Sequence, residues 1–265
     1  MPEATVQIFT TVVNRPVFQH YQARLFRKYL SGDYRFHVVD DSVEPGMNRE
    51  FENVCREQGL EYHRRPMRFF RRYFSRLDAS AATAAAIQWT WDRLIKPNYP
   101  NCVVLLLDSD MLLIEPFDPV QYIEGYTLAG LMQKKGHVTY PWNGLMLFNM
   151  PEILRLGGDL DFSADPVEGC AVDTAGHLYY FVHRPGVRLR ETDPGMAPQY
   201  PARYKDIDLH DPELTNGYLI ELHCEGRFLH YRSASNWFID GEWRRSSDPL
   251  AQKTRVFLQM IEDRL

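Results

Sequence analysis

The segment 103–114 constrains the fold more than any other part of this sequence. Two aspartates, Asp108 and Asp110, stand there between two blocks of aliphatic residues. Burying an ionised carboxylate without a partner is costly, so two acids in this setting indicate a nearby cation. The five apolar residues before Asp108 predict a strand buried on both faces, and open α/β sheets bind ligands where such strands end. A divalent cation completed by substrate phosphates suits this carboxylate pair.

The composition narrows the class of protein. The 265 residues suffice for one α/β domain, and 45% hydrophobic with 25% charged residues is ordinary for a soluble globular chain. A formal net charge of -5 argues against a nucleic-acid partner. The four cysteines form neither a zinc signature nor a disulfide framework, and no signal peptide or membrane span is recognisable. We therefore expect a soluble, cytoplasmic protein.

Strands and helices are expected to alternate over the first 120 residues. The predicted strands cover 6–13, 34–39, 60–64 and 103–107, and the predicted helices cover 18–30, 48–58 and 78–95. This alternation predicts an α/β fold with a mostly parallel central sheet flanked by helices. The second half is less regular, with a strand at 144–148 and long loops at 157–170 and 183–217. Loops of that length in a compact domain are usually functional or mobile.

Asp108-Ser109-Asp110 allows three interpretations. The acids could belong to a surface turn. They could be the nucleophile motif of a haloacid-dehalogenase-type phosphatase, but that fold begins at its nucleophile strand, whereas about 100 residues of α/β pattern precede this one. Met111 also stands where such an enzyme has Thr or Val. We favour the third interpretation, a divalent-metal site for a nucleoside diphosphate.

Three motifs then carry a resemblance to a known family. They are Phe74-Ser75-Arg76-Leu77, the strand and turn from Val104 to Pro116, and Trp142-Asn143-Gly144-Leu145-Met146-Leu147-Phe148-Asn149. Together they resemble the GT-A fold nucleotide-sugar glycosyltransferases with a D-x-D motif, in particular the glycogenin and galactosyltransferase-like (family 8-like) group. The resemblance implies a single GT-A domain over residues 1–265, with a nucleotide-binding half at about 1–115 and an acceptor-binding half at about 116–265.

The resemblance also implies roles for the donor and metal residues. Asp108 and Asp110 would hold Mn²⁺ or Mg²⁺ on the donor diphosphate, with Ser109 between them at the donor and Arg76 nearby. Thr10 and Thr11 end the first strand, where this fold lines the nucleoside pocket, although strand propensity alone would explain them. Asp40 could accept hydrogen bonds from the base or ribose, or it could simply belong to a turn or helix cap.

The third metal ligand is expected to be a histidine. His230 ends an apolar and aromatic strand late in the chain, where the resembling family keeps a metal-binding histidine. His223 is the nearest alternative. A hydrogen-bonded, half-buried histidine with no metal is the other interpretation of His230.

The remaining predicted residues face the sugar. Asp173 lies in a turn of small residues, where the resembling group has an acid beside the sugar donor, so it is the candidate catalytic carboxylate. An acid that stabilises or attacks the anomeric centre accompanies retention, which the resemblance favours, whereas a base would give inversion. The predicted sugar- and acceptor-binding residues are Trp142, Asn143, Ser235 and Asn236. Aromatic residues such as Trp142 more often fill cores.

The segment 64–76 is strongly basic, with aromatic residues between its arginines. It could contact a membrane surface peripherally, attract the donor phosphates, or form a solvated helix face.

Taken together, these patterns predict a metal-dependent glycosyltransferase that uses a nucleotide-sugar donor, UDP-linked, and a glycan or glycoconjugate acceptor. A metal-dependent phosphohydrolase is the alternative, and a carbohydrate-binding module without catalysis is a third hypothesis. The identity of the sugar and of the acceptor does not follow from the sequence.

Overall fold

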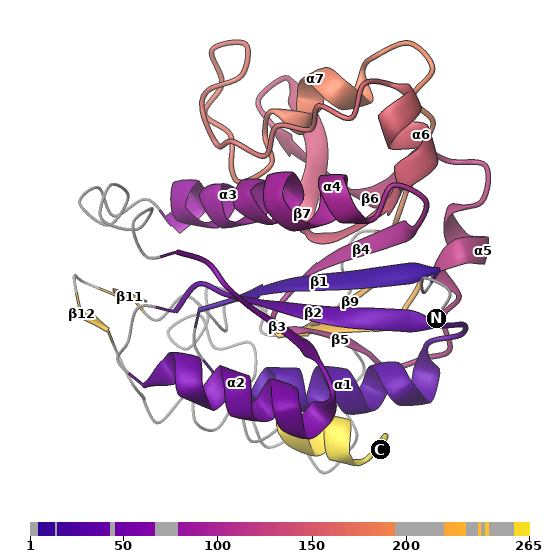
Figure 1. Ribbon diagram of the computed structural model, residues 1–265. Helices are drawn as coiled ribbons and strands as arrows, with labels where there is room; N and C mark the ends of the chain where they lie inside the picture. The colour runs from indigo at the N-terminus through magenta and orange to yellow at the C-terminus, as the bar shows by residue number, and fades with distance from the viewer. Residues whose placement is uncertain are drawn as a thin grey trace.

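The computed structural model describes residues 5–13, 15–42, 46–66, 79–193, 220–231, 238–239, 242–243 and 257–265. Its centre is a seven-stranded sheet with the order β3-β2-β1-β4-β7-β6-β8 (Figure 1). These strands are β1 (Val6–Val12), β2 (Tyr34–Asp40), β3 (Glu61–Arg64), β4 (Val103–Asp108), β6 (Leu128–Lys135), β7 (Val138–Asn149) and β8 (Leu189–Glu191). The helices are α1 (Val17–Tyr29), α2 (Met47–Gln58), α3 (Ala79–Thr90), η3 (Trp91–Ile95), α4 (Lys96–Asn98), α5 (Pro119–Ile123), α6 (Met150–Arg155) and α7 (Leu178–Val182).

The sheet is mostly parallel, as the alternating pattern predicts. β3, β2, β1 and β4 run parallel to one another, and β8 runs parallel to β6. β7 is antiparallel to both β4 and β6. The carboxyl ends of β1, β2 and β4 therefore meet at one edge, where open α/β sheets bind their ligands.

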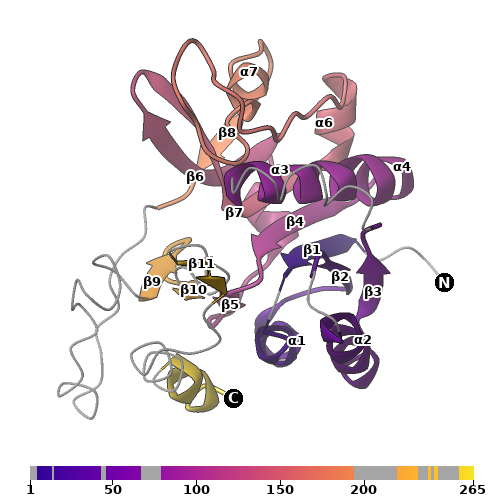
Figure 2. The same ribbon diagram turned by 90° about the vertical axis from the view of Figure 1, so that its left-hand side faces the viewer.

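Helices cover both faces of the sheet. α1 and α2 lie on one face and α3 with α4 on the other, as Figures 1 and 2 show. Side chains of β4 alternate between the two layers: Leu105 and Leu107 join the core under α1 and α2, whereas Val104 and Leu106 join the core under α3. This two-sided burial confirms the strand that the aliphatic run before Asp108 predicts.

Two elements differ from the sequence expectation. The helix expected at 78–95 changes to a π-helical turn at η3, and Pro97 follows in α4. Pro97 cannot donate the next helical hydrogen bond, and a wider turn accommodates its ring. β7 is longer than the expected 144–148 because it continues through Pro141, which lies opposite an irregularity in β6 between Gly130 and Met132. Proline is tolerated in a sheet at such places.

A second, three-stranded sheet has the order β5-β10-β9, and β11 (Phe238–Ile239) pairs antiparallel with β12 (Glu242–Trp243). The strands of the second sheet are β5 (Met111–Leu113), β9 (Ile220–His223) and β10 (Phe228–Tyr231). Leu112 and Leu229 pack with Phe18 of α1 and with the helix at 257–262. This core fixes β10 beside the chain that follows Asp108.

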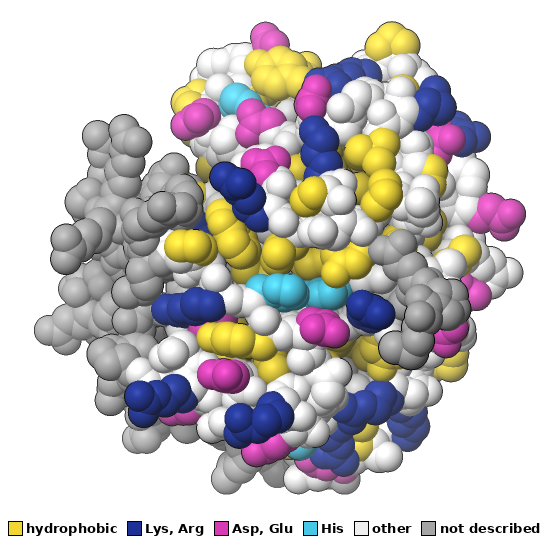
Figure 3. Space-filling view, viewed as in Figure 1, with side chains coloured by type: hydrophobic (Ala, Val, Ile, Leu, Met, Phe, Trp, Pro, Cys, Tyr) yellow, Lys and Arg dark blue, Asp and Glu magenta, His cyan; other side chains and the backbone are white. Residues whose placement is uncertain are grey.

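A histidine pair lies on β2 and β3. His37 Nδ1 and His63 Nε2 are 3.0 Å apart, and the His37 ring stacks on Phe9 at 4.3 Å between centroids. Histidine side chains gather at the centre of the face seen in Figure 3, below a band of hydrophobic side chains.

Within the described parts of the chain, no helix combines the length and apolar character needed to cross a membrane.

Candidate functional site

The two predicted aspartates meet a histidine at the carboxyl edge of the sheet. Asp108 is the last residue of β4, and Asp110 follows two residues later. β10 pairs with β5 so that His230 lies opposite Met111. Asp108, Asp110 and His230 each offer one possible ligand atom, and these three atoms lie within 4.8 Å of one another. His230 is therefore the histidine that joins the aspartates, whereas His223 groups with His230 and Glu221.

Burial and mutual repulsion shape the electrostatics of this cluster. Asp108 is half-buried, and Asp110 and His230 are only 4% and 5% exposed. Burial and then the charge of Asp110 raise the pKa of Asp108 to about 7. Burial opposes a charge on His230, but the nearby carboxylates outweigh it and raise the pKa of His230 to about 9. His230 Nε2 lies 3.6 Å from Asp110 Oδ1. A positive charge, on this ring or on a bound cation, would offset part of the negative charge of the two carboxylates.

β7 brings Trp142 and Asn143 to the same cluster. Asn143 Nδ2 donates to Asp108 Oδ1 at 3.4 Å. The Trp142 ring lies 5.2 Å from the rings of both His223 and His230. A Cβ at Gly144 would lie 2.1 Å from Cη2 of Trp142, so the indole rests directly over the backbone there. The Trp-Asn-Gly sequence therefore packs the indole beside the histidines, and its sugar-binding role stays a prediction.

Asp173 lies in the turn before α7, half-buried and close enough for its charge to help raise the pKa of Asp108. Ser80 Oγ donates to its Oδ1, and the main-chain N–H of Thr174 donates to the same oxygen at 2.8 Å. The Asp173 N–H donates to Tyr140 Oη at 2.8 Å. The turn thus holds this carboxyl group in one orientation beside the start of α3.

Two glutamines of α1, which the sequence analysis missed, support the backbone of the aspartate turn. Gln22 Nε2 donates to the carbonyl oxygens of Asp108 at 3.1 Å and Met111 at 2.9 Å. Gln19 Nε2 donates to the carbonyl oxygen of Ser109 at 3.4 Å. Both glutamines are fully buried and stand three residues apart on one helix face. Their three-residue spacing places them on one helix face, but nothing in the sequence shows that this face packs against the aspartate turn.

Glu221 is a further residue that the sequence analysis missed. Its Oε2 lies 3.2 Å from both His230 Nδ1 and His223 Nε2. Burial alone would raise the pKa of Glu221, but the hydrogen bonds from His223 and His230 outweigh it and hold that pKa well below its usual range. Burial lowers the pKa of His223.

Thr10 and Thr11 lie near the carboxyl end of β1, directly before its last residue Val12. Thr11 pairs with Asp108 in register, and Thr10 is fully buried next to Leu107. Neither hydroxyl has a hydrogen-bond partner among the described residues. Their role at the nucleoside stays a prediction.

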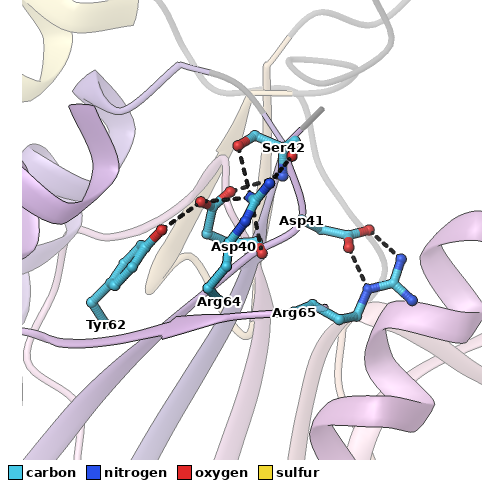
Figure 4. A network of polar contacts seen from close by, with 6 residues as sticks. All are labelled: Asp40, Asp41, Ser42, Tyr62, Arg64 and Arg65. Carbon is cyan, nitrogen blue, oxygen red and sulfur yellow. Dashed lines mark hydrogen bonds and ion pairs between the residues drawn. The ribbon is translucent and has the colours of Figure 1, made fainter. Parts of the chain in front are cut away.

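Asp40 belongs to a polar network at the end of β2 (Figure 4). Its carboxylate accepts from the N–H of Ser42 at 2.8 Å and from Tyr62 Oη at 2.7 Å, and it pairs with Arg64 at 2.7 Å. The neighbouring Asp41 forms a bidentate ion pair with Arg65, whose Nη2 lies 2.8 Å from Asp41 Oδ2. These contacts are compatible with the turn interpretation of Asp40, and its donor role stays a prediction.

Three predicted residues, Arg76, Ser235 and Asn236, lie outside the described residues, as does most of the basic segment 64–76. A groove of about 490 Å³ lies between α3 and the loop from Asp161 to Asp165. Arg65, Ala81, Trp89 and Arg93 are among its lining residues. Ala81 follows Ser80, so the groove lies next to the residue that contacts Asp173.

Comparison with solved structures agrees with this architecture. An active-site mutant of LgtC has a TM-score of 0.51 with 15% sequence identity, over 96% of this chain and 95% of that one. The chain has a GT-A glycosyltransferase fold. The fold-level part of the resemblance is thereby confirmed.

Two further GT-A neighbours score slightly lower. LgtC, a galactosyltransferase solved with donor and acceptor sugar analogues, gives a TM-score of 0.48 at 14% identity, over 96% of this chain and 95% of that one. A mannosyltransferase from Pyrobaculum calidifontis, PcManGT with GDP-Man and Mn²⁺, gives 0.46 at 13% identity, over 71% of this chain. This GT-A chain spans 55% of the length of PcManGT. No protein-family model and no curated protein sequence matches it.

Proposed function

We propose that this GT-A chain is a metal-dependent glycosyltransferase that moves a sugar from a nucleotide-sugar donor, UDP-linked, to a hydroxyl of a glycan or glycoconjugate. The observation that carries the proposal is the cluster of Asp108, Asp110 and His230 at the carboxyl end of β4, with ligand atoms within 4.8 Å. The GT-A sheet ends at this point, and open α/β sheets bind nucleotides there.

The donor set fits a divalent cation. Two carboxylates and one imidazole lie close enough to share one ion. Burial and then the charge of Asp110 raise the pKa of Asp108, and a cation would favour the ionised form of both carboxylates. Mg²⁺ prefers oxygen ligands, and the His230 nitrogen therefore favours Mn²⁺ as the cofactor. When bound, the cation supplies Lewis-acid stabilisation of the diphosphate that leaves the sugar.

We assign separate roles to the residues around the leaving diphosphate. Asp108, Asp110 and His230 would hold the cation, and Asn143 orients Asp108 by its hydrogen bond at 3.4 Å. Thr10 and Thr11 offer hydroxyls that have no partner among the described residues to the nucleoside from the neighbouring strand. These hydroxyls can donate to and accept from a base or ribose.

Asp173 is the proposed carboxylate beside the anomeric carbon. Ser80 and the Thr174 N–H hold one of its oxygens, so the side chain enters the reaction already oriented. A fixed carboxylate at this place stabilises or captures the positive anomeric centre, which supports retention of configuration. The groove beside α3 lies next to Ser80 and offers Trp89 as a flat surface for an acceptor sugar.

Calorimetry with UDP and Mn²⁺ tests the proposal. UDP is expected to bind the wild-type chain only in the presence of Mn²⁺, and Asp110→Ala is expected to abolish that binding. Glu115→Ala is the matched control, because it removes an exposed carboxylate five residues away that contributes nothing to the cluster. Manganese-dependent release of UDP from UDP-hexoses, lost in Asp173→Asn, would then establish transfer or hydrolysis at this site.

Three results would contradict the proposal. Hydrolysis of p-nitrophenyl phosphate without any nucleotide binding would favour a phosphohydrolase. Saccharide binding that needs neither metal nor nucleotide would favour a carbohydrate-binding module. UDP binding that is unaffected by Asp110→Ala would place the metal elsewhere.

A further inference from the structure

The antiparallel pair β9 and β10 places a carboxylate directly behind His230. The two strands lie beside β5 (Figure 2), and Glu221 is the register partner of His230. Side chains of directly opposed residues lie on the same face of a sheet, and residues two apart share that face. Glu221, His223 and His230 therefore project together, whereas Leu222 and Leu229 project into the opposite core.

The hydrogen bonds set the orientation of the His230 ring. Glu221 Oε2 lies 3.2 Å from His230 Nδ1, and a carboxylate can only accept, so Nδ1 carries the proton. The other nitrogen, Nε2, faces the carboxylate cluster at 3.6 Å from Asp110 Oδ1. A neutral imidazole with its proton on Nδ1 presents its lone pair on Nε2, which is the form that ligates a metal.

His223 in turn fixes Glu221. It is 3% exposed, and its Nε2 donates to the same Glu221 oxygen at 3.2 Å. Its Nδ1 has no partner among the described residues, so this ring is not recruited by another polar group there. The rings of His223 and His230 lie 5.4 Å apart and both flank Trp142. Glu221 is thus held between two imidazoles, with little freedom to turn away.

We propose that Glu221, buttressed by His223, is the positioning residue that keeps His230 Nε2 turned toward the metal site. The inference rests on the proposed function, because it assigns a role toward the cation held by Asp108 and Asp110. Outer carboxylates that hold a ligating histidine in this way typically contribute about 10- to 100-fold to metal affinity.

The same three side chains, Glu221, His223 and His230, also have ligand atoms within 4.8 Å and could hold a cation themselves. Their hydrogen bonds argue for the positioning role, since Glu221 and the two rings already use those atoms on one another. The two arrangements differ in stoichiometry. The positioning role gives one Mn²⁺ per chain, and a separate site gives two.

Isothermal titration with Mn²⁺ alone is the first test. Glu221→Gln is expected to bind one Mn²⁺ about 10- to 100-fold more weakly than the wild type. Glu225→Gln is the matched control, because it makes the same charge change in the same hairpin but pairs with Arg227 and Tyr122. Unchanged affinity in Glu221→Gln would overturn the inference, and so would a second Mn²⁺ that only this variant loses.

The second test reads the ring itself. Nitrogen-15 spectra of the metal-free wild type, titrated until His230 is neutral, are expected to show the proton on Nδ1. In Glu221→Gln the two tautomers are expected to mix, which a loss of packing alone would not produce. A neutral wild-type His230 with its proton on Nε2 would overturn the inference. Because this measurement uses the wild type, it tests the inference even if Glu221→Gln does not fold. If the wild type binds no Mn²⁺, the proposed function fails, whereas a failure confined to Glu221→Gln concerns the positioning role alone.

Discussion

The side-chain amide of Gln22 in α1 donates to the carbonyl oxygen of Met111 at 2.9 Å, across 89 residues of sequence. The same amide donates to the carbonyl oxygen of Asp108 at 3.1 Å, so it joins both ends of the turn that carries the aspartates. The turn between these two carbonyls leads from β4 into β5. Gln22 of the neighbouring helix therefore holds both ends of the backbone from which the carboxylates project, and Gln19 holds its middle at Ser109.

Gln22→Leu is predicted to destabilise the protein by about 1–3 kcal/mol, because two buried carbonyl groups lose their donor. The loosened turn is also expected to weaken Mn²⁺ binding. Urea unfolding measures the first effect and calorimetry the second. Arg24→Ala is the control on the same helix: its ion pair with Glu262 is partly exposed, so it is expected to change stability by less than about 1 kcal/mol. Equal Mn²⁺ affinity in wild type and Gln22→Leu would contradict the predicted role.

Gly144→Ala is predicted to displace the Trp142 ring from His223 and His230. A Cβ there would lie 2.1 Å from the indole, which is closer than any real contact, so the ring must move. The emission of Trp142 should shift toward that of an exposed indole, with Trp142→Phe used to assign the signal. Gly130→Ala is the control, because its Cβ would meet its neighbours at an ordinary 3.5 Å. An unchanged Trp142 signal in Gly144→Ala would refute the prediction.

The aspartate pair and its strand could be predicted because their signal is local. The apolar run that ends at Asp108 indicates a buried strand, and the alternation of strands and helices predicts the sheet around it. His230 could be proposed on its late strand with help from the resemblance, although the sequence left His223 open beside it. The register of β10 on β5, which brings His230 rather than His223 to the aspartates, is not encoded in any short segment.

The supporting residues could not be predicted for the same reason. Gln22 lies 86 residues before Asp108, and Glu221 reaches His230 only through the antiparallel pairing of β9 with β10. A glutamine on a helix and a glutamate on a strand are usually solvent-exposed, so the residue type does not indicate a buried supporting role. Only the fold shows that Gln22 is buried, and Glu221 partly buried, against the site.

His37 is predicted to make the protein sensitive to acid. Burial, and then the charges of His63 and Arg35, lower the pKa of His37 to about 3, whereas an unfolded histidine titrates near 6.5. The unfolded chain therefore binds a proton first, and stability present above about pH 6.5 is lost as the pH falls toward 3. His37→Gln should flatten the fall in unfolding free energy between about pH 6.5 and 4.5, which is worth up to about 1.4 kcal/mol per pH unit. Urea unfolding across this range measures it, with His137→Gln at an exposed turn as control; parallel slopes for wild type and His37→Gln would refute it.

The two side chains of the Asp41–Arg65 ion pair (Figure 4) are predicted to be strongly coupled, because both residues are nearly inaccessible to solvent, at 3% and 2% exposure. Burial outweighs the attraction of Arg65 and raises the pKa of Asp41 to about 7, so either partner left alone is costly. Arg65→Leu and Asp41→Leu are each expected to lose about 3–5 kcal/mol, and the double variant is expected to lose clearly less than their sum. Urea unfolding of the wild type, the two single variants and the double variant completes this double-mutant cycle. The same cycle on Lys96 and Asp159, whose side chains are 38% and 75% exposed, is expected to give a coupling below about 1 kcal/mol. Additive losses at Asp41 and Arg65 would show instead that the two side chains act independently.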